Sequence, residues 1–132
     1  MNMEQNIGLV TLVVKEYDEA IEFYTQKVGF DLVEDTELSL DKRWVVVKPR
    51  NSKSSGLLLA QAANETQIKS IGNQTGGRVF LFLNTDNFWR DYKTMIEKGV
   101  NFLDEPREEA YGMVSVFEDL YGNKWDLLEL KK

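Results

Sequence analysis

Neither cysteine nor histidine occurs among the 132 residues of this chain, and each absence excludes a class of chemistry. Without cysteine the chain forms no disulfides, no thiolate nucleophile and no cysteine-ligated zinc or iron–sulfur centre. Without histidine it lacks the commonest metal ligand and the only side chain that titrates near neutral pH without being perturbed. Any catalysis must therefore use carboxylates, tyrosine, lysine, arginine or a bound cofactor. The absence of cysteine also leads us to expect a cytoplasmic protein.

The chain also lacks a long apolar run and a basic cluster. No apolar stretch reaches the length that crosses a bilayer, so we expect no membrane partner. The formal net charge of −6 repels polyanions, so we expect no nucleic-acid partner. Hydrophobic residues make up 42% of the chain, which is enough for one sizeable core. The composition therefore predicts a single soluble domain over residues 1–132.

Apolar periodicity predicts the same order of elements in both halves of the chain. A helical stripe begins at Tyr17 and stops at Gly29, and a second begins at Phe88 and stops at Gly99. Each stripe follows one short aliphatic run and precedes three others, which predict strands. The predicted strands are residues 7–14, 30–36, 43–48 and 56–62, then 78–83, 100–103, 112–118 and 124–130.

The two halves are a diverged tandem repeat. A shift of 69 residues aligns residues 9–14 with residues 78–83, and a shift of 68 aligns residues 57–59 with residues 125–127. We therefore predict an α+β fold of two tandem βαβββ modules. The modules are expected at about residues 6–62 and 77–130, joined by a linker helix at about residues 64–72 that Asn64 can cap.

Two segments resemble the vicinal oxygen chelate superfamily, which includes glyoxalase I, extradiol dioxygenases, and bleomycin and fosfomycin resistance proteins. They are LVVKEYDEAIEFYTQKVGFDLVEDT near the start and VFEDLYGNKWDLLEL at the end. The resemblance implies that the two modules form a curved, incompletely closed mixed sheet whose concave face is a ligand cleft. It also implies a homodimer.

The resemblance further implies four metal-binding positions, and in this sequence they map onto Leu9, Leu58, Arg78 and Asp126. Leucine has no donor atom and a guanidinium repels a cation, so only Asp126 keeps an oxygen ligand. We therefore expect no metal and no other cofactor. Instead we hypothesise that Arg78 and Asp126 form an ion pair that offers N–H groups to a bound anion. A purely structural pair that closes the sheet is an equally weighted alternative.

Other candidate ligand-binding residues are expected on the same face. Arg43 and Trp44 place a cation beside an aromatic ring, although Trp44 in the core and Arg43 in solvent is the favoured interpretation. The segment PREEAYG is predicted to be a loop that covers the ligand. The remaining candidates are Arg107, Glu109 and Tyr111 in that loop, Gln74 before the second module, and an apolar lining drawn from Leu9, Leu58, Trp44, Phe80, Phe82 and Trp125.

Three functions are compatible with these residues. The first is a metal-independent protein that binds a small organic molecule, aromatic or anionic, in the cleft. The second is a glyoxalase-, isomerase- or dioxygenase-type enzyme that acts through an enolate-like intermediate, whose catalytic candidates are Arg78, Asp126, Glu109 and Tyr111. The third is a dimeric regulatory module with a vestigial cleft. The sequence favours the first function.

Overall fold

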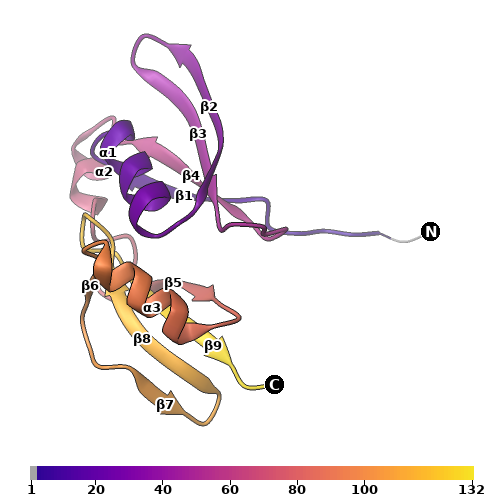
Figure 1. Ribbon diagram of the computed structural model, residues 1–132. Coiled ribbons are helices and arrows are strands. Elements are labelled where there is room, and N and C mark those ends of the chain that lie inside the picture. The colour runs from indigo at the N-terminus through magenta and orange to yellow at the C-terminus, as the bar shows by residue number, and fades with distance from the viewer. Residues whose placement is uncertain (1–2) are drawn as a thin grey trace. The chain divides into compact units, whose positions relative to one another are not determined.

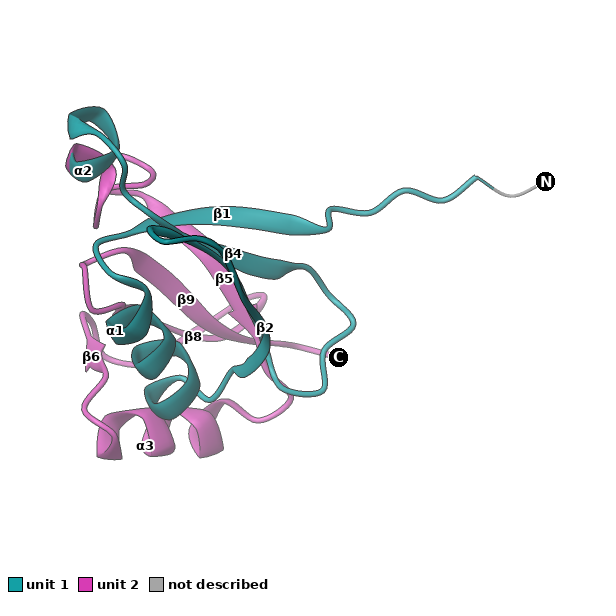
Figure 2. Cartoon of the chain, turned by 90° about the horizontal axis from the view of Figure 1, so that it is seen from above, with its two compact units in different colours: residues 1–68 teal, residues 69–132 magenta. Residues whose placement is uncertain are grey.

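The predicted order of strand, helix and three strands occurs in the first half of the chain, and the second half repeats it with one additional short strand. The computed structural model describes residues 3–132, and the chain divides into two compact units, Met1–Ile68 and Lys69–Lys132 (Figure 2). The predicted α+β fold and its two βαβββ modules are confirmed. No helix within residues 3–132 is long and apolar enough to cross a membrane.

The first unit is a mixed four-stranded sheet with one helix packed on it (Figure 1). The strand order is β1-β4-β3-β2, in which β1 and β4 are parallel and the other pairs are antiparallel. Its elements are β1 (Leu9–Val14), α1 (Tyr17–Glu22), a π-helical turn η1 (Phe23–Lys27), β2 (Asp31–Ser39), β3 (Lys42–Lys48), β4 (Gly56–Gln61) and the start of α2 (Glu65–Ser70).

One face of this first sheet packs on α1 and forms the core of the unit. Alternate residues of β1, β4 and β3 are fully or almost fully buried there, together with Tyr17, Ala20 and Tyr24 of the helix and turn. The buried strand residues are Leu12, Val14, Leu57, Leu59, Val45 and Val47. The strand β2 extends to Ser39, beyond the predicted residue 36, because Ser39 still pairs with Lys42 across the hairpin.

The second unit repeats this plan with an additional short strand. Its sheet has the order β5-β9-β8-β6, with β5 and β9 parallel and β7 paired to β8 alone. Its helix α3 packs through Phe88 and Met95. The elements are β5 (Val79–Asn84), α3 (Phe88–Glu97), β6 (Asn101–Phe102), β7 (Arg107–Glu109), β8 (Gly112–Glu118) and β9 (Lys124–Leu130).

A chain of aromatic contacts fixes α3 on its sheet. The ring of Tyr92 lies 4.6 Å from that of Phe102, which lies 5.5 Å from Phe117, and Phe117 stacks on Trp125 at 5.8 Å. These centroid distances are typical of favourable aromatic pairs. Because Phe117 and Trp125 lie opposite each other in β8 and β9, the odd-numbered residues of both strands face the helix. The even-numbered residues face away from it.

The segment PREEAYG is not the loop that the sequence predicts. Residues 107–109 form β7, an edge strand whose Arg107 pairs with Val114 of β8. Ahead of β7 the chain bulges away from the ladder, and the Asp104 carboxylate accepts hydrogen bonds from the Val116 N–H at 2.8 Å and the Ser115 hydroxyl at 2.9 Å. A side chain therefore supplies the partner that the interrupted backbone ladder lacks.

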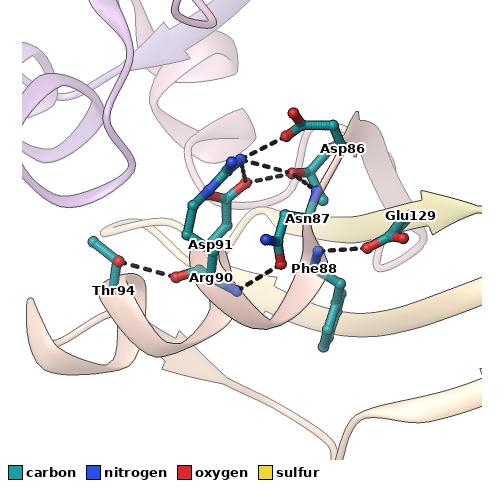
Figure 3. A network of polar contacts seen from close by, with 8 residues as sticks. Asp86, Asn87, Phe88, Arg90, Asp91, Thr94 and Glu129 are labelled. Carbon is teal, nitrogen blue, oxygen red and sulfur yellow. Dashed lines mark hydrogen bonds and ion pairs between the residues drawn. The ribbon is translucent and has the colours of Figure 1, made fainter.

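The N-terminus of α3 is held by a polar network (Figure 3). The Asn87 side chain accepts a hydrogen bond from the Arg90 N–H at 3.2 Å, and the Glu129 carboxylate of β9 accepts one from the Phe88 N–H at 2.7 Å. Two of the N–H groups that a helix leaves unpaired at its start therefore have partners. The second contact also joins the helix to the sheet.

We predict that Asn87→Ala lowers the free energy of unfolding by about 1 kcal/mol, because the Arg90 N–H loses its acceptor. Urea unfolding monitored by circular dichroism measures the change. Asn87→Asp keeps a capping oxygen and is expected to lose much less. Equal losses in the two variants would contradict the assignment of Asn87 as the cap.

Candidate functional site

Each sheet has a second face, opposite its helix, and these faces carry the candidate residues. In the first unit, pairing of Leu58 with Thr11 and Val46 places these three side chains together on the face opposite α1. Trp44 and Leu9 lie on this same face by alternation, and both are at least partly exposed. This surface is largely apolar, and its one carboxylate among these strand partners is Glu34 of β2, which pairs with Val46 and accepts a hydrogen bond from the Thr36 hydroxyl at 3.5 Å.

Arg43 and Trp44 point to opposite faces of the first sheet, so they do not form the predicted cation and ring pair. Arg43 lies on the helix side, where its guanidinium bonds to Asp35 at 2.7 Å and Asp18 at 2.8 Å. It also lies 5.1 Å from the ring centroid of Tyr17. The guanidinium lowers the pKa of the Asp35 carboxyl by a direct hydrogen bond. Arg43 joins α1 to the β2–β3 hairpin, which is a structural role.

Asp126 is the most distinctive side chain on the face opposite α3. The strand register places it between Phe82 of β5 and Val116 of β8, neither of which has a side-chain polar atom. Asp126 is only 9% exposed, whereas Phe82 is 61% exposed. Among residues 3–132, the buried Oδ1 atom of Asp126 has no hydrogen-bond partner. A buried carboxylate oxygen without a partner costs free energy that a stable fold usually avoids.

The surroundings of Asp126 oppose its ionisation. Burial raises the pKa of this carboxyl, the nearby Arg107 guanidinium works in the opposite direction, and the Asp104 carboxylate raises it further. Within residues 3–132 Arg107 forms no ion pair with Asp126, and its guanidinium bonds instead to Asp104 at 3.1 Å and Glu109 at 2.9 Å. Asp104, Arg107 and Glu109 therefore form a charged cluster near Asp126, but the positive charge of this cluster is paired with its own carboxylates and not with Asp126.

Asp104 is a member of this cluster that sequence reasoning did not identify. Burial opposes its ionisation, but bonds from the Val116 N–H, the Ser115 hydroxyl and Arg107 lower the pKa of the Asp104 carboxyl overall. Asp104 depends on the bulge that precedes β7, and no periodicity marks such a bulge in advance. The sequence does place a serine, Ser115, within an otherwise apolar strand, and the structure shows that this serine is fully buried.

The structure does not bring Arg78 to Asp126. Phe82 lies opposite Asp126, and Arg78 precedes Phe82 by four residues, or roughly 13 Å along an extended strand. Arg78 is exposed at a bend before β5, and no ion pair joins it to Asp126 within the described part of the chain. The hypothesised ion pair is therefore not formed.

The strand register also shifts the repeat alignment by one residue. Leu9 pairs with Gly56, which is two residues before Leu58 in β4. In the same way, Val79 pairs with Lys124, which is two residues before Asp126 in β9. Val79, rather than Arg78, is therefore the counterpart of Leu9. An irregularity in β5 just after Val79 explains why a constant offset fails here.

Gln74 and Tyr111 have structural contacts that the sequence does not reveal. The Gln74 amide donates to the Ser70 carbonyl at 2.8 Å, which ties the loop before β5 to the end of α2. Tyr111 lies half-exposed in the turn between β7 and β8, where its carbonyl accepts a hydrogen bond from the Lys131 N–H at 3.0 Å. Neither contact brings these side chains to Asp126.

The donor set does not fit a divalent metal. Of Leu9, Leu58 and Val79, none has a donor atom, and Asp126 is a single carboxylate. Within residues 3–132 no three carboxylates are grouped so that they could share an ion. Asp104 and Glu109 do not extend the set, because both bind Arg107. The residues present therefore support recognition by hydrogen bonding, charge and packing.

We predict that Asp126→Asn raises the free energy of unfolding at pH 7, since the folded protein no longer holds a poorly solvated charge. The pKa of Asp126 is raised above its ordinary value of 3.8 by folding, so the folded state binds this proton more readily than the unfolded state. Stability is therefore lost as the pH rises from 3.8 through the folded-state pKa. The gain in the variant should be small below pH 3.8 and larger at pH 7.

Urea unfolding at the two pH values measures this difference. Asp86→Asn is a matched control, because the bond from Arg90 lowers the pKa of the exposed Asp86 carboxyl and predicts no gain. An Asp126→Asn variant that is less stable than the unaltered chain at pH 7 would contradict the prediction.

Comparison with known proteins places this geometry in a family. An uncharacterized protein of Shewanella frigidimarina (strain NCIMB 400) is 59% identical over 129 residues, which cover 97% of this chain and 96% of that protein. The crystal structure of UcmS2 is similar, with a TM-score of 0.83, 28% identity and coverage of 96% of this chain and 98% of that one.

A second solved structure is that of TnmS3, an antibiotic binding protein from Streptomyces sp. CB03234. It has a TM-score of 0.77 and 27% identity, and the match covers 99% of both chains. The family model for the Glyoxalase/Bleomycin resistance protein/Dioxygenase superfamily matches residues 6–127. The match covers the first module and the second as far as Leu127 in β9, and so includes Asp126. This chain therefore belongs to the Glyoxalase/Bleomycin resistance protein/Dioxygenase superfamily.

Proposed function

We propose that this protein binds a small organic molecule without a metal, and that the ligand contacts the second sheet on the face opposite α3. The observation that carries this proposal is Asp126. It is the only one of the four positions implied by the family resemblance that keeps a polar ligand-type side chain, and its buried oxygen lacks a partner within residues 3–132. Unpartnered buried polar groups are common where a ligand completes the site.

The neighbours of Asp126 suit binding rather than metal-dependent catalysis. Phe82, directly opposite, presents an exposed aromatic surface, and Val116 on the other side is apolar. Binding sites for small molecules typically combine such apolar contacts with a few polar groups that fix orientation. An enzyme of the glyoxalase or dioxygenase type would need further ligands around Asp126, and the positions that would supply them are apolar.

The comparisons agree with this proposal. TnmS3, which shares 27% identity with this chain, is described as an antibiotic binding protein. Members of one superfamily can differ in function, so this likeness supports a class of function and not a particular ligand. We extend only the general property, binding of a small organic molecule, to this chain.

A thermal-shift screen of metabolites and antibiotics, with and without EDTA, tests the proposal. A ligand present at about a hundredfold excess over its Kd should stabilise the folded protein by about 2.7 kcal/mol, and EDTA should not change the shift. A stoichiometric divalent ion in the purified protein, or a shift that EDTA abolishes, would overturn the metal-independent function. A screen without any stabilising compound would count against binding itself.

Two variants locate the site once a ligand is found. Phe82→Ala should weaken binding, since the ligand loses an exposed aromatic contact. Arg43→Met is the matched control, because Arg43 lies in the first unit on the helix side of its sheet and binds Asp18 and Asp35. It should lower stability and leave the Kd unchanged. Unchanged binding in Phe82→Ala would exclude the face opposite α3.

The proposal includes a cytoplasmic homodimer. The edge strand β2 exposes apolar side chains, Leu32, Val33 and Leu38, and an exposed strand edge of this kind is commonly covered by a partner chain. Light scattering after size-exclusion chromatography should give twice the mass of the 15.3 kDa chain. Leu38→Lys should shift the protein towards the monomer, and a monomeric unaltered chain would remove the dimer from the proposal.

A further inference from the structure

The row of side chains across β5, β9 and β8 restricts what the ligand can be. In this row Asp126 lies between Phe82 and Val116, at the spacing of about 4.8 Å that separates neighbouring strands. An exposed aromatic ring and a carboxylate that lacks a hydrogen-bond donor are therefore adjacent on one face. A ligand that satisfies both must have an apolar surface and an N–H or O–H group close together.

The carboxylate can be reached despite its burial. Asp126 is 9% exposed, so a donor on a ligand can reach the carboxylate from its exposed side, and the two oxygens share its negative charge. Phe82 is more than half exposed, so a ligand can contact its ring without displacing a packed core residue. The donor would compensate for part of the free energy that the unpartnered oxygen costs.

The charges around Asp126 select against an anionic ligand. Asp104, Glu109 and Asp126 contribute three negative charges, and Arg107 contributes one positive charge, which leaves a net −2. Arg107 is bonded to two of these carboxylates and has little attraction left for a ligand anion. The whole chain, with a net charge of −6, acts in the same direction. A neutral or cationic ligand is favoured.

We infer that the ligand is a planar aromatic molecule, neutral or cationic, that carries an amino or hydroxyl group, stacks on Phe82 and donates a hydrogen bond to Asp126. This inference rests on the proposed function and defines the chemical class of the molecule bound. The donor on the ligand replaces the partner that the protein does not supply. A ring with the same shape but no donor would leave the Asp126 oxygen unpaired on binding.

Three acridines test the inference on the full chain. Proflavine carries two primary amino groups, and acridine has no amino group. The third compound, 10-methylacridine orange, is a cation with the same ring system in which the amino nitrogens and the ring nitrogen are all methylated, so it has no N–H group. We expect fluorescence titration at pH 7 to give a Kd for proflavine at least about tenfold lower than for the other two. This ratio corresponds to one hydrogen bond to a charged acceptor.

Variants of Asp126 and Phe82 test whether these two residues cause the preference for proflavine. Asp126→Asn should raise the Kd for proflavine about tenfold and change that for acridine little, because only proflavine donates to the carboxylate. Phe82→Ala should weaken both. Asp86→Asn and Trp89→Ala are matched controls that remove an exposed carboxylate and an exposed ring elsewhere, and neither should change binding. Circular dichroism confirms that each variant is folded.

The outcomes separate this inference from the proposed function. Equal affinity for proflavine and 10-methylacridine orange, or a preference that survives Asp126→Asn, overturns the hydrogen bond to Asp126. If none of the acridines binds while the screen yields another ligand, the inferred class is wrong and the binding function stands. Loss of the proflavine preference in Asp86→Asn as well would show that net charge alone attracts the probe, and would also overturn the inference.

Discussion

Parallel pairing of the first and last strands of each unit is the constraint on which the rest of the structure depends. It places β1 beside β4 and β5 beside β9, although four elements of chain separate the members of each pair. The helix after the first strand covers one face of the sheet, and alternation sends every second side chain to the other face. In the second unit this arrangement places Phe82 opposite Asp126. The candidate site is thus a consequence of register.

The duplicated fold provides an internal comparison for Asp126. Its counterpart in the first unit is Leu58, which lies at the same place in the strand order and pairs with a residue of β1 in the same way. An apolar side chain therefore suits this position of the fold. A carboxylate there costs desolvation free energy, and Arg107, whose charge acts on it, is already paired with Asp104 and Glu109. Residues that break a local packing rule without compensation are typical of functional sites.

Periodicity was sufficient to predict most of the fold. The two helical stripes and eight of the nine strands within residues 3–132 follow from apolar spacing, because each element buries one face and that burial leaves a pattern in the sequence. The exception, β7, is a three-residue edge strand with two charged glutamates and an arginine, which have no such pattern. Its pairing depends on the adjacent strand β8, and not on its own composition.

The site was less predictable than the fold, because its contacts depend on irregularities. An irregularity after Val79 moves Arg78 out of register with Leu9, and a bulge before β7 places Asp104 beside the edge of β8. Neither leaves a signal in hydropathy. Arg43 was ambiguous because the sequence does not show to which face a residue at the start of a strand points. Its two carboxylate partners, Asp18 and Asp35, come from separate elements.

A single retained carboxylate selects ligands differently from a metal centre. A metal ion binds any pair of oxygens that fits its coordination shell, and the protein then controls the remaining contacts. A partly buried carboxylate without a partner instead distinguishes ligands by whether they carry a hydrogen-bond donor. A ligand that lacks a donor binds more weakly, because it leaves the carboxylate oxygen desolvated and unpaired. Sites built on such a hydrogen bond reject the analogue without it far more strongly than apolar pockets reject a change of size. In the proposed site, selectivity at Asp126 would therefore arise from the hydrogen-bond donor that the ligand must supply.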